Sequence, residues 1–185
     1  MEAYPKKIEL KDGAVLTLRT MNRDDQNALY KFFTSLPAAS RRFLRNDVTD
    51  KRIIEKWVRD LNFEKVLPIL AEFEGRIVAN VSLHRQTFGW GRHVGEIRIA
   101  VADDFRGRGL SSVLLDEVSH VAARQGLKKI VARVITSRQG TMKAFHNVGF
   151  QNVAVLKRYV KDIYQKRYAD IAILVKELTP VSEQA

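Results

Sequence analysis

Cysteine is absent from this 185-residue sequence. Its absence excludes disulfide bridges, thiolate nucleophiles and Cys-ligated zinc or iron–sulfur sites. Histidine is scarce too: there are four, with no His-x-x-x-His pair, so we expect no metal site. No apolar run approaches the roughly 20 residues that a membrane-spanning helix needs, and the N-terminal sequence lacks the apolar segment of a signal peptide. We therefore expect a cytoplasmic protein with no membrane partner.

Acidic residues are few in residues 121–170, which carry 11 Lys or Arg against only Asp162 and Asp170. The rest of the chain is almost balanced in charge. Such a basic stretch attracts nucleic acid, an acidic protein surface or a phosphorylated cofactor, and a solvated face that maintains solubility is the alternative. We do not expect nucleic acid, because the stretch lacks a series of aromatic side chains for base stacking and no helix-turn-helix is evident.

The hydrophobic pattern predicts a single mixed α/β domain over residues 1–185, with a core over about 14–178 and a frayed tail at 179–185. The turn pairs Asp12-Gly13 and Glu74-Gly75 predict two hairpins. The order of strands and helices is typical of a mostly antiparallel sheet with helices on both faces. The expected strands cover 7–10, 15–19, 66–73, 76–84, 95–101, 128–135, 153–160 and 168–175, and the expected helices cover 22–36, 50–61, 110–125 and 141–148.

The strongest functional pattern follows the strand at 95–101. That strand leads through the loop RGRG (106–109) directly into a predicted helix. Gly107 and Gly109 let backbone N–H groups approach an anion, and the helix N-terminus adds positive charge, which suits a pyrophosphate. The pattern is neither a Walker loop nor a dinucleotide fingerprint, because no Gly-Lys-Ser/Thr follows and Ser112 stands where a third glycine is required. A tight turn with two solvated arginines is the alternative.

With its surroundings, this segment resembles the GNAT superfamily of acetyl-CoA-dependent N-acyltransferases. The family motif, Arg/Gln-x-x-Gly-x-Gly/Ala, is matched by Arg106-Gly107-Arg108-Gly109-Leu110-Ser111, with Ser111 departing from it. The resemblance covers nearly the whole chain, including the pair Gly149-Phe150. It implies a single GNAT-like domain with two splayed parallel strands, in which the backbone of Ile99 and Val101 contacts the pantetheine of acetyl-CoA. Residues 106–111 would then hold the pyrophosphate.

Two other positions depart from the family pattern. Phe145 stands where many members carry a tyrosine that protonates the leaving thiolate, and the adjacent His146 should point about 100° away around its helix. Tyr159 and Tyr164 are the other proton donors nearby in sequence. Arg138 stands where many members have asparagine; it either binds the 3′-phosphate of acetyl-CoA or lies in solvent.

Acetyl transfer to an amine requires a neutral nucleophile, so a base must take a proton. Glu96 is the predicted catalytic base, because the resemblance places a carboxylate on the central strand beside the substrate groove. An ion pair with Arg98, two residues on and on the same face, is the alternative. His84 and His93 are weaker candidates for the base.

The predicted activity is therefore transfer of an acetyl group from acetyl-CoA to a primary amine, with backbone N–H groups near Val101 polarising the thioester. The acceptor is a small molecule or a peptide, and the chain is compatible with a homodimer. The alternative is a non-catalytic module on the same fold that senses acyl-CoA or binds nucleic acid. We expect substrate choice to depend on residues 22–65 and 86–95.

Three smaller expectations concern residues near these segments. Asp103 and Asp104 should cap the turn before the glycine loop. Phe33 and Trp57 should belong to the core rather than contact a ligand. The glycine-rich loop around Trp90 either gates a site or simply connects two strands.

Overall fold

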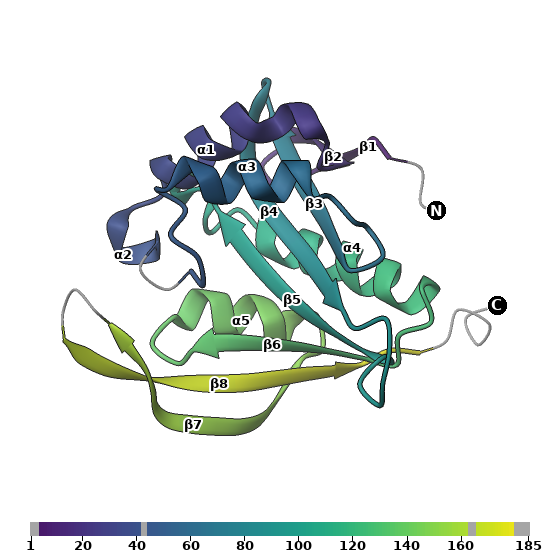
Figure 1. The fold of residues 1–185 in the computed structure, drawn as a ribbon, viewed down its shortest axis with the longest axis vertical. Coiled ribbons are helices and arrows are strands. Elements are labelled where there is room, and N and C mark those ends of the chain that lie inside the picture. Colours follow the sequence, from purple (N-terminus) through teal and green to yellow (C-terminus); the bar gives the residue numbers. More distant parts are fainter. Residues whose placement is uncertain (1–3, 42–43, 163–165, 180–185) are drawn as a thin grey trace.

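Eight strands form one sheet across residues 4–41, 44–162 and 166–179, which are the residues that the computed structural model describes (Figure 1). The strands are β1 (Lys6–Glu9), β2 (Val15–Thr20), β3 (Val66–Phe73), β4 (Arg76–Arg85), β5 (Val94–Val101), β6 (Lys129–Ile135), β7 (Gln151–Asp162) and β8 (Arg167–Glu177). The helices are α1 (Gln26–Ser35), α2 (Ala38–Arg41), α3 (Lys51–Arg59), α4 (Leu110–Arg124) and α5 (Gln139–Asn147), with 3-10 turns η1 (Arg23–Asp25) and η2 (Asp103–Phe105).

The sheet is divided between its two central strands. The strand order is β1-β2-β3-β4-β5-β6-β8-β7, and every neighbouring pair is antiparallel except β5 and β6. The parallel pairing of β5 with β6 ends where Ile97 lies opposite Ala132. Beyond that point β5 stays paired with β4 as far as Val101, and β6 stays paired with β8 as far as Ile135. The two halves of the sheet therefore remain intact while the gap between them opens, as the resemblance implied.

Helices cover both faces of the sheet. Figure 1 shows α1 and α3 over one face and α4 over the other, and α4 contacts β4, β5 and α5. The apolar stripes predicted for these helices are buried: α1 contributes Leu29 and Phe32, and α4 contributes Leu114 and Val118. Burying side chains of this size stabilises the fold by about 1.5–3 kcal/mol each. None of the helices among the described residues is long and apolar enough to span a membrane.

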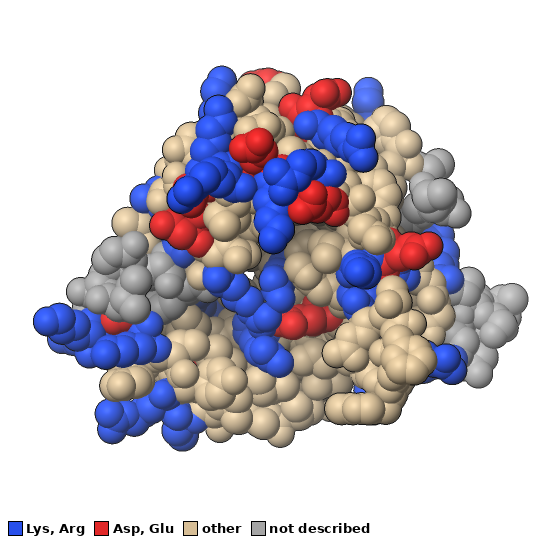
Figure 2. Space-filling model, in the orientation of Figure 1, with Lys and Arg blue, Asp and Glu red and all other residues tan. Residues whose placement is uncertain are grey.

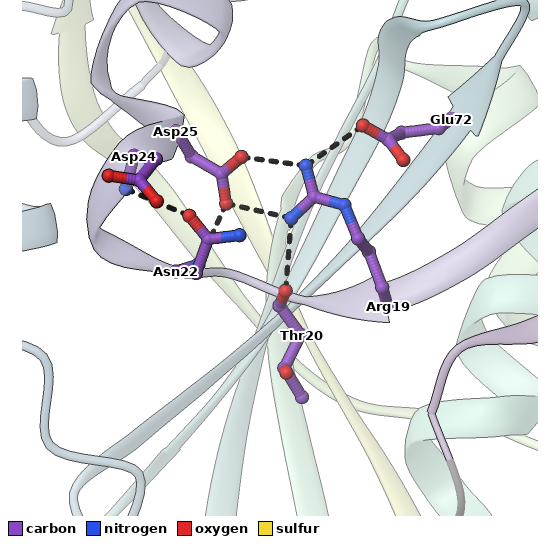
Figure 3. A network of polar contacts seen from close by, with 6 residues as sticks. All are labelled: Arg19, Thr20, Asn22, Asp24, Asp25 and Glu72. Atoms are coloured by element: carbon purple, nitrogen blue, oxygen red, sulfur yellow. Dashed lines mark hydrogen bonds and ion pairs between the residues drawn. The ribbon is translucent and has the colours of Figure 1, made fainter.

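A charged network fixes the start of α1 against the sheet (Figure 3). The Arg19 guanidinium on β2 donates to both Asp25 oxygens, at 2.6 and 2.8 Å, and to Glu72 on β3 at 2.8 Å. Asp25 is buried, and its carboxylate also accepts from the backbone N–H of Asn22, the predicted helix cap. Removing the arginine would leave a buried carboxylate unpaired, which costs about 3–5 kcal/mol. The network thus sets the position from which α1 runs across the sheet.

The element bounds follow the sequence prediction with small differences. The strand predicted at 153–160 extends over the whole of β7, and the helix predicted from residue 141 begins at Gln139. The short helix α2 was not predicted. Trp90, in the loop between β4 and β5, is 94% exposed, so almost none of its surface packs against the described residues.

Candidate active site

A slot opens where β5 and β6 part. It has a volume of about 130 Å³ and is walled by β5 and β6 around and beyond the point where their mutual pairing ends, by residues before α3 and by residues of α5. Ile99, predicted from the resemblance, lines it; Val101, at the end of β5, is buried beside it in the strand but is not part of the lining. The residues of this interstrand slot are Leu44, Arg45, Glu96, Ile97, Arg98, Ile99, Ala132, Arg133, Val134, Ile135, Arg138, Thr141 and Phe145.

The glycine loop after η2 has the geometry predicted for an anion site. Gly107 and Gly109 have φ of 75° and 88°, a left-handed conformation that side chains other than glycine rarely adopt. A Cβ at either glycine would meet no atom within 4 Å, so the space above the loop is open. Gly109 is the N-cap of α4, whose first backbone N–H groups have no partner within the helix. The Leu110 side chain is fully buried, which leaves only its backbone to face a ligand.

Ser40 on α2 links the loop to the slot. Its hydroxyl oxygen accepts from Arg106 Nη2 at 2.9 Å and from Arg138 Nη2 at 3.1 Å. Arg106 also pairs with Asp103 at 2.7 Å. Two guanidiniums that lie 32 positions apart in the sequence therefore converge beside the glycine loop, at the mouth of the slot that Arg138 lines.

Arg108 is engaged on the other side of the loop. Its guanidinium pairs with Asp12 in the β1–β2 turn and lies over the Phe105 ring, 4.3 Å from the centroid. The expectation that Asp103 and Asp104 cap the turn is wrong, because no side chain caps η2. Both carboxylates instead form ion pairs: Asp103 pairs with Arg106, and Asp104 pairs with an arginine at the start of β4. Salt bridges to nearby arginines compete successfully with backbone capping in this segment.

A larger cavity, which we call the β4 pocket, lies between the sheet and the α1–α3 layer. It has a volume of about 330 Å³ and mostly apolar walls. Phe33 and Trp57 meet edge to face in its wall, with ring centroids 5.5 Å apart. They were predicted to belong to the core only, but they also line this pocket. The lining consists of Met21, Phe33, Leu44, Arg45, Asn46, Val48, Lys56, Trp57, Asp60, Leu61, Asn62, Lys65, Val66, Pro68, Asn80, Ser82, His84, Arg98, Ile99 and Ala100.

The β4 pocket and the interstrand slot meet. Leu44, Arg45, Arg98 and Ile99 line both cavities. The two cavities are therefore adjacent at these four residues. Figure 2 shows Lys and Arg side chains gathered around a hollow in the middle of this face of the molecule.

The floor of the β4 pocket is polar because side chains along β4 alternate between the two faces of the sheet, and the face that lines this pocket carries the polar ones. Asn80, Ser82 and His84 share one strand face and line the cavity. Across the ladder, Ser82 pairs in register with Arg98 and His84 with Glu96. Ser82 Oγ and His84 Nε2 are hydrogen-bonded at 2.9 Å. Burial, with the Arg98 guanidinium close by, lowers the pKa of His84 from 6.5 to about 4, so its imidazole is neutral at physiological pH.

Glu96 lies between two arginines. Its carboxylate forms an ion pair with Arg45, which comes from the segment before α3, and its Oε2 lies 3.8 Å from Arg98 Nη2. The ion pair with Arg98 that the sequence offered as an alternative is therefore present, and Arg45 is the nearer partner. His84 and Glu96, two of the residues proposed as base, lie opposite each other on adjacent strands.

The other predicted proton carriers lie elsewhere. His93, His146 and Tyr159 are exposed and line neither cavity. Tyr164 lies outside the described residues. Phe145 is buried and lines the slot, with its ring edge-on to Phe150 at 4.9 Å. No tyrosine is among the described residues that line the two cavities.

Four residues of the site were not assigned a role from the sequence: Ser40, Arg45, Asn80 and Ser82. For two of them a signal was present, because polar residues at every second position interrupt an otherwise apolar strand, RIVANVSLH. Ser40 and Arg45 carry no such signal.

Across residues 4–41, 44–162 and 166–179, no three His, Asp or Glu side chains are arranged to hold a metal ion.

Comparisons with known proteins agree with this geometry. The model of the acetyltransferase (GNAT) family matches residues 28–150. A Bacillus subtilis (strain 168) protein, YwnH, named provisionally as a phosphinothricin acetyltransferase, is 26% identical over 171 residues, which are 89% of this chain and 100% of YwnH.

Two solved structures share the fold at lower identity. The GNAT domain of S. lividans PAT superimposes with a TM-score of 0.79 at 19% identity, covering 96% of this chain and 99% of that domain. YncA from Salmonella typhimurium, provisionally named an acetyltransferase and solved with its cofactor acetyl-CoA, has a TM-score of 0.75 at 21% identity. The match covers 89% of this chain and 94% of YncA.

Proposed function

This chain belongs to the acetyltransferase (GNAT) family and is an acyltransferase, and from that premise we propose that it transfers the acetyl group of acetyl-CoA to a primary amine held in the β4 pocket. The observation that carries the proposal is the meeting of two cavities at Arg98 and Ile99. One cavity is a narrow slot between splayed strands, and the other is a pocket of the size that small-molecule sites have. Their junction is where a thioester and an amine would be brought into contact.

The residues around the slot fit acetyl-CoA. The open loop at Gly107 and Gly109, with the N-terminus of α4, suits the pyrophosphate. Arg106 and Arg138 lie close enough together to share Ser40 and supply two cations at the same end of the slot. The backbone of Ile99 and Val101, on the side of β5 that has no strand partner, suits the amides of pantetheine. Ser111 contributes its backbone N–H at the start of α4, as does Leu110, whereas the Arg108 side chain supports the loop through Asp12.

When bound, acetyl-CoA supplies an activated acetyl group; the chain must orient the amine and take its proton. A primary ammonium with a pKa near 10 is almost fully protonated at neutral pH, so a base is required. Glu96 is our proposed base, acting directly or through a water, and His84 is the alternative. Glu96 must share its lone pairs with Arg45, whereas His84 is neutral and forms no ion pair with any described residue.

Among the described residues that line the slot, no tyrosine is present to protonate the departing thiolate. Phe145 occupies the position from which other members donate, and it lacks an acidic proton. A thiol with a pKa of roughly 8.5 leaves as the thiolate without an acid, at a cost in rate. We therefore propose a slow acetyltransferase.

Turnover with a panel of acceptors tests the proposal. The purified chain is mixed with acetyl-CoA and with amino acids, phosphinothricin, polyamines or short peptides, and thiol release and acetylated product are measured together. Acetylated product that depends on the enzyme supports the proposal. Acetyl-CoA binding without any product over the whole panel contradicts it and favours the non-catalytic module.

A further inference from the structure

Positive charge is in excess where the β4 pocket meets the slot. Arg45 and Arg98 both lie beside the carboxylate of Glu96, the one carboxylate among the described residues that line the slot, and Arg133 lines the slot as well. The wall of the β4 pocket adds two lysines near its rim, and the one carboxylate there, Asp60, is already paired with an arginine outside the pocket. Among the described residues around the junction, positively charged side chains therefore outnumber the carboxylates that could neutralise them.

Arg98 is a partly buried cation whose hydrogen bonding is incomplete. Its Nε is buried and has no hydrogen-bond partner among the residues that the structure describes, and its nearest carboxylate oxygen is 3.8 Å away. Burial, together with the guanidiniums of Arg45 and Arg133, lowers the pKa of Arg98 from its ordinary value. An anion bound beside Arg98 would accept a hydrogen bond from its guanidinium and offset the positive charge of the neighbouring arginines.

Acetyl-CoA does not provide that anion in the proposed binding mode. Its charges are on phosphates, which we place at the glycine loop with Arg106 and Arg138. The pantetheine and thioester that run along the slot toward Arg98 are uncharged. The excess positive charge at the junction is therefore left for the acceptor.

The rest of the β4 pocket limits what else the acceptor carries. Its wall is aromatic and aliphatic, with Phe33 and Trp57 side by side, and its volume of about 330 Å³ accommodates a molecule of amino-acid size. Asn80 lies on the floor, and its Oδ1 accepts no hydrogen bond from any described residue. A buried carbonyl oxygen without a partner favours a ligand that brings an N–H donor.

We infer, on the basis of the proposed function, that the acceptor is a small amine carrying an anionic group and an apolar body, as in an apolar α-amino acid, and that Arg98 binds the anion. Arg98 is then the residue that determines specificity, while Phe33 and Trp57 contact the apolar body. A peptide N-terminus, whose first carboxyl group is an amide, would lack the charge that Arg98 selects.

Matched acceptors test this inference in the wild-type chain. We compare kcat/KM for L-leucine and L-phenylalanine with the values for the amides of the same amino acids. A charge-assisted contact with Arg98 predicts a preference of about 10- to 100-fold for the acid over the amide. The amine of the amide is less basic, so a larger fraction of it is unprotonated at neutral pH, and the supply of free amine alone predicts the opposite order. Equal values, or a preference for the amides, would overturn the inference.

Variants assign the preference to Arg98. The Arg98→Gln variant should lose the preference for the acid over the amide, whether or not its overall rate falls. Arg98→Lys keeps the charge and should retain part of the ratio; it also replaces Arg98→Gln in the comparison if that variant does not fold. The control is Arg52→Gln, an exposed arginine on α3 outside both cavities, which should keep the full ratio. A ratio unchanged in Arg98→Gln would overturn the assignment.

A binding measurement separates this inference from the proposed function. If no amine is acetylated, the proposed function fails, and calorimetry with 4-methylpentanoate and its amide still tests the anion site without any turnover. Binding of the carboxylate alone, lost in Arg98→Gln, supports the site. No difference between the carboxylate and the amide overturns it.

Discussion

The carboxylate of Glu96 on β5 is paired with the guanidinium of Arg45, which stands 51 positions earlier in the sequence, before α3. This ion pair lies where the slot and the β4 pocket meet, so it fastens the segment before α3 to the central strand. It also occupies lone pairs that a catalytic base needs. The same contact thus shapes the junction and competes with the amine for the carboxylate.

Substitutions of the two partners should differ in their effect on turnover. Glu96→Gln keeps the shape but removes the base, so kcat/KM should fall by about 10²–10⁴-fold while acetyl-CoA affinity holds. Arg45→Gln leaves the carboxylate free for the amine and should retain turnover. The measurements are thiol-release kinetics and calorimetry with CoA. Glu177→Gln, which breaks an exposed pair between the end of β8 and Lys129 at the start of β6, outside the lining of both cavities, is the control. Full activity in Glu96→Gln would transfer the role of base to His84.

Gly109 should be required for acetyl-CoA binding. The Gly109→Glu variant places a side chain and a negative charge in the open space above the loop, so binding measured by calorimetry should be abolished. Gly126 is the matched control, because it too has positive φ (77°) and open space at its Cβ but lies at the far end of α4. Gly126→Glu therefore suffers the same backbone strain and should keep its affinity. Equal affinity in both folded variants would falsify the pyrophosphate assignment.

Arg138 should distinguish CoA from dephospho-CoA. If its guanidinium binds the 3′-phosphate, Arg138→Gln should weaken CoA by about 1.5–3 kcal/mol when the contact is buried, less when it is exposed, and leave dephospho-CoA almost unchanged. Arg106→Gln serves as the contrast, since loss of a pyrophosphate contact should weaken both ligands alike. Equal losses for both ligands in Arg138→Gln would assign this residue to a solvated face.

Local signals predicted the fold well. Asn22 caps the first helical turn, and the Glu74-Gly75 pair forms a hairpin turn in which both residues have positive φ. The glycine loop before α4 was recognisable for the same reason: its chemistry depends on residues that are adjacent in the chain. The parting of β5 and β6 was implied only by the resemblance, because no local pattern records where a pairing stops.

Contacts between distant residues were not predictable in the same way. The Glu96–Arg98 pair follows from the two-residue period of a strand, and it is present at 3.8 Å. Arg45 and Ser40 reach the site only because two described parts of the segment between α1 and α3, namely α2 and the residues from 44 onward, lie beside the parting of the strands. That segment has no hydrophobic period to place it, so its side chains could not be assigned to the site from the sequence.

His84 should make the protein less stable in acid. Its folded pKa of about 4 lies below the ordinary 6.5, so the unfolded chain binds more protons between these pH values, and stability falls as the pH drops from about 6.5 to 4. His84→Gln removes this dependence. Between pH 7 and pH 5, urea unfolding should show the wild type losing about 1–2 kcal/mol more than the variant, after allowance for solvent screening. The same loss in both proteins would contradict the burial of a neutral His84.

Phe145 stands where many family members carry a tyrosine that acts as general acid, so substituting tyrosine at this position should speed the reaction. The ring is buried and lines the slot, so Phe145→Tyr adds a hydroxyl within the slot that the proposed thiolate occupies. General acids typically contribute about 10²–10⁴-fold, so a kcat increase of about 10-fold or more is expected where departure of the thiolate limits the rate. The measurement is kcat at saturating acetyl-CoA.

The matched control adds the same hydroxyl to the neighbouring ring. Phe150 packs edge-on against Phe145 but does not line the slot. Phe150→Tyr should therefore leave kcat unchanged, and it should lose about 1–3 kcal/mol of stability from overpacking. A faster Phe145→Tyr beside an unchanged Phe150→Tyr assigns the gain to the hydroxyl in the slot. If both variants fold and neither is faster, proton supply to the thiolate does not limit this enzyme, and the proposed cost of Phe145 is wrong.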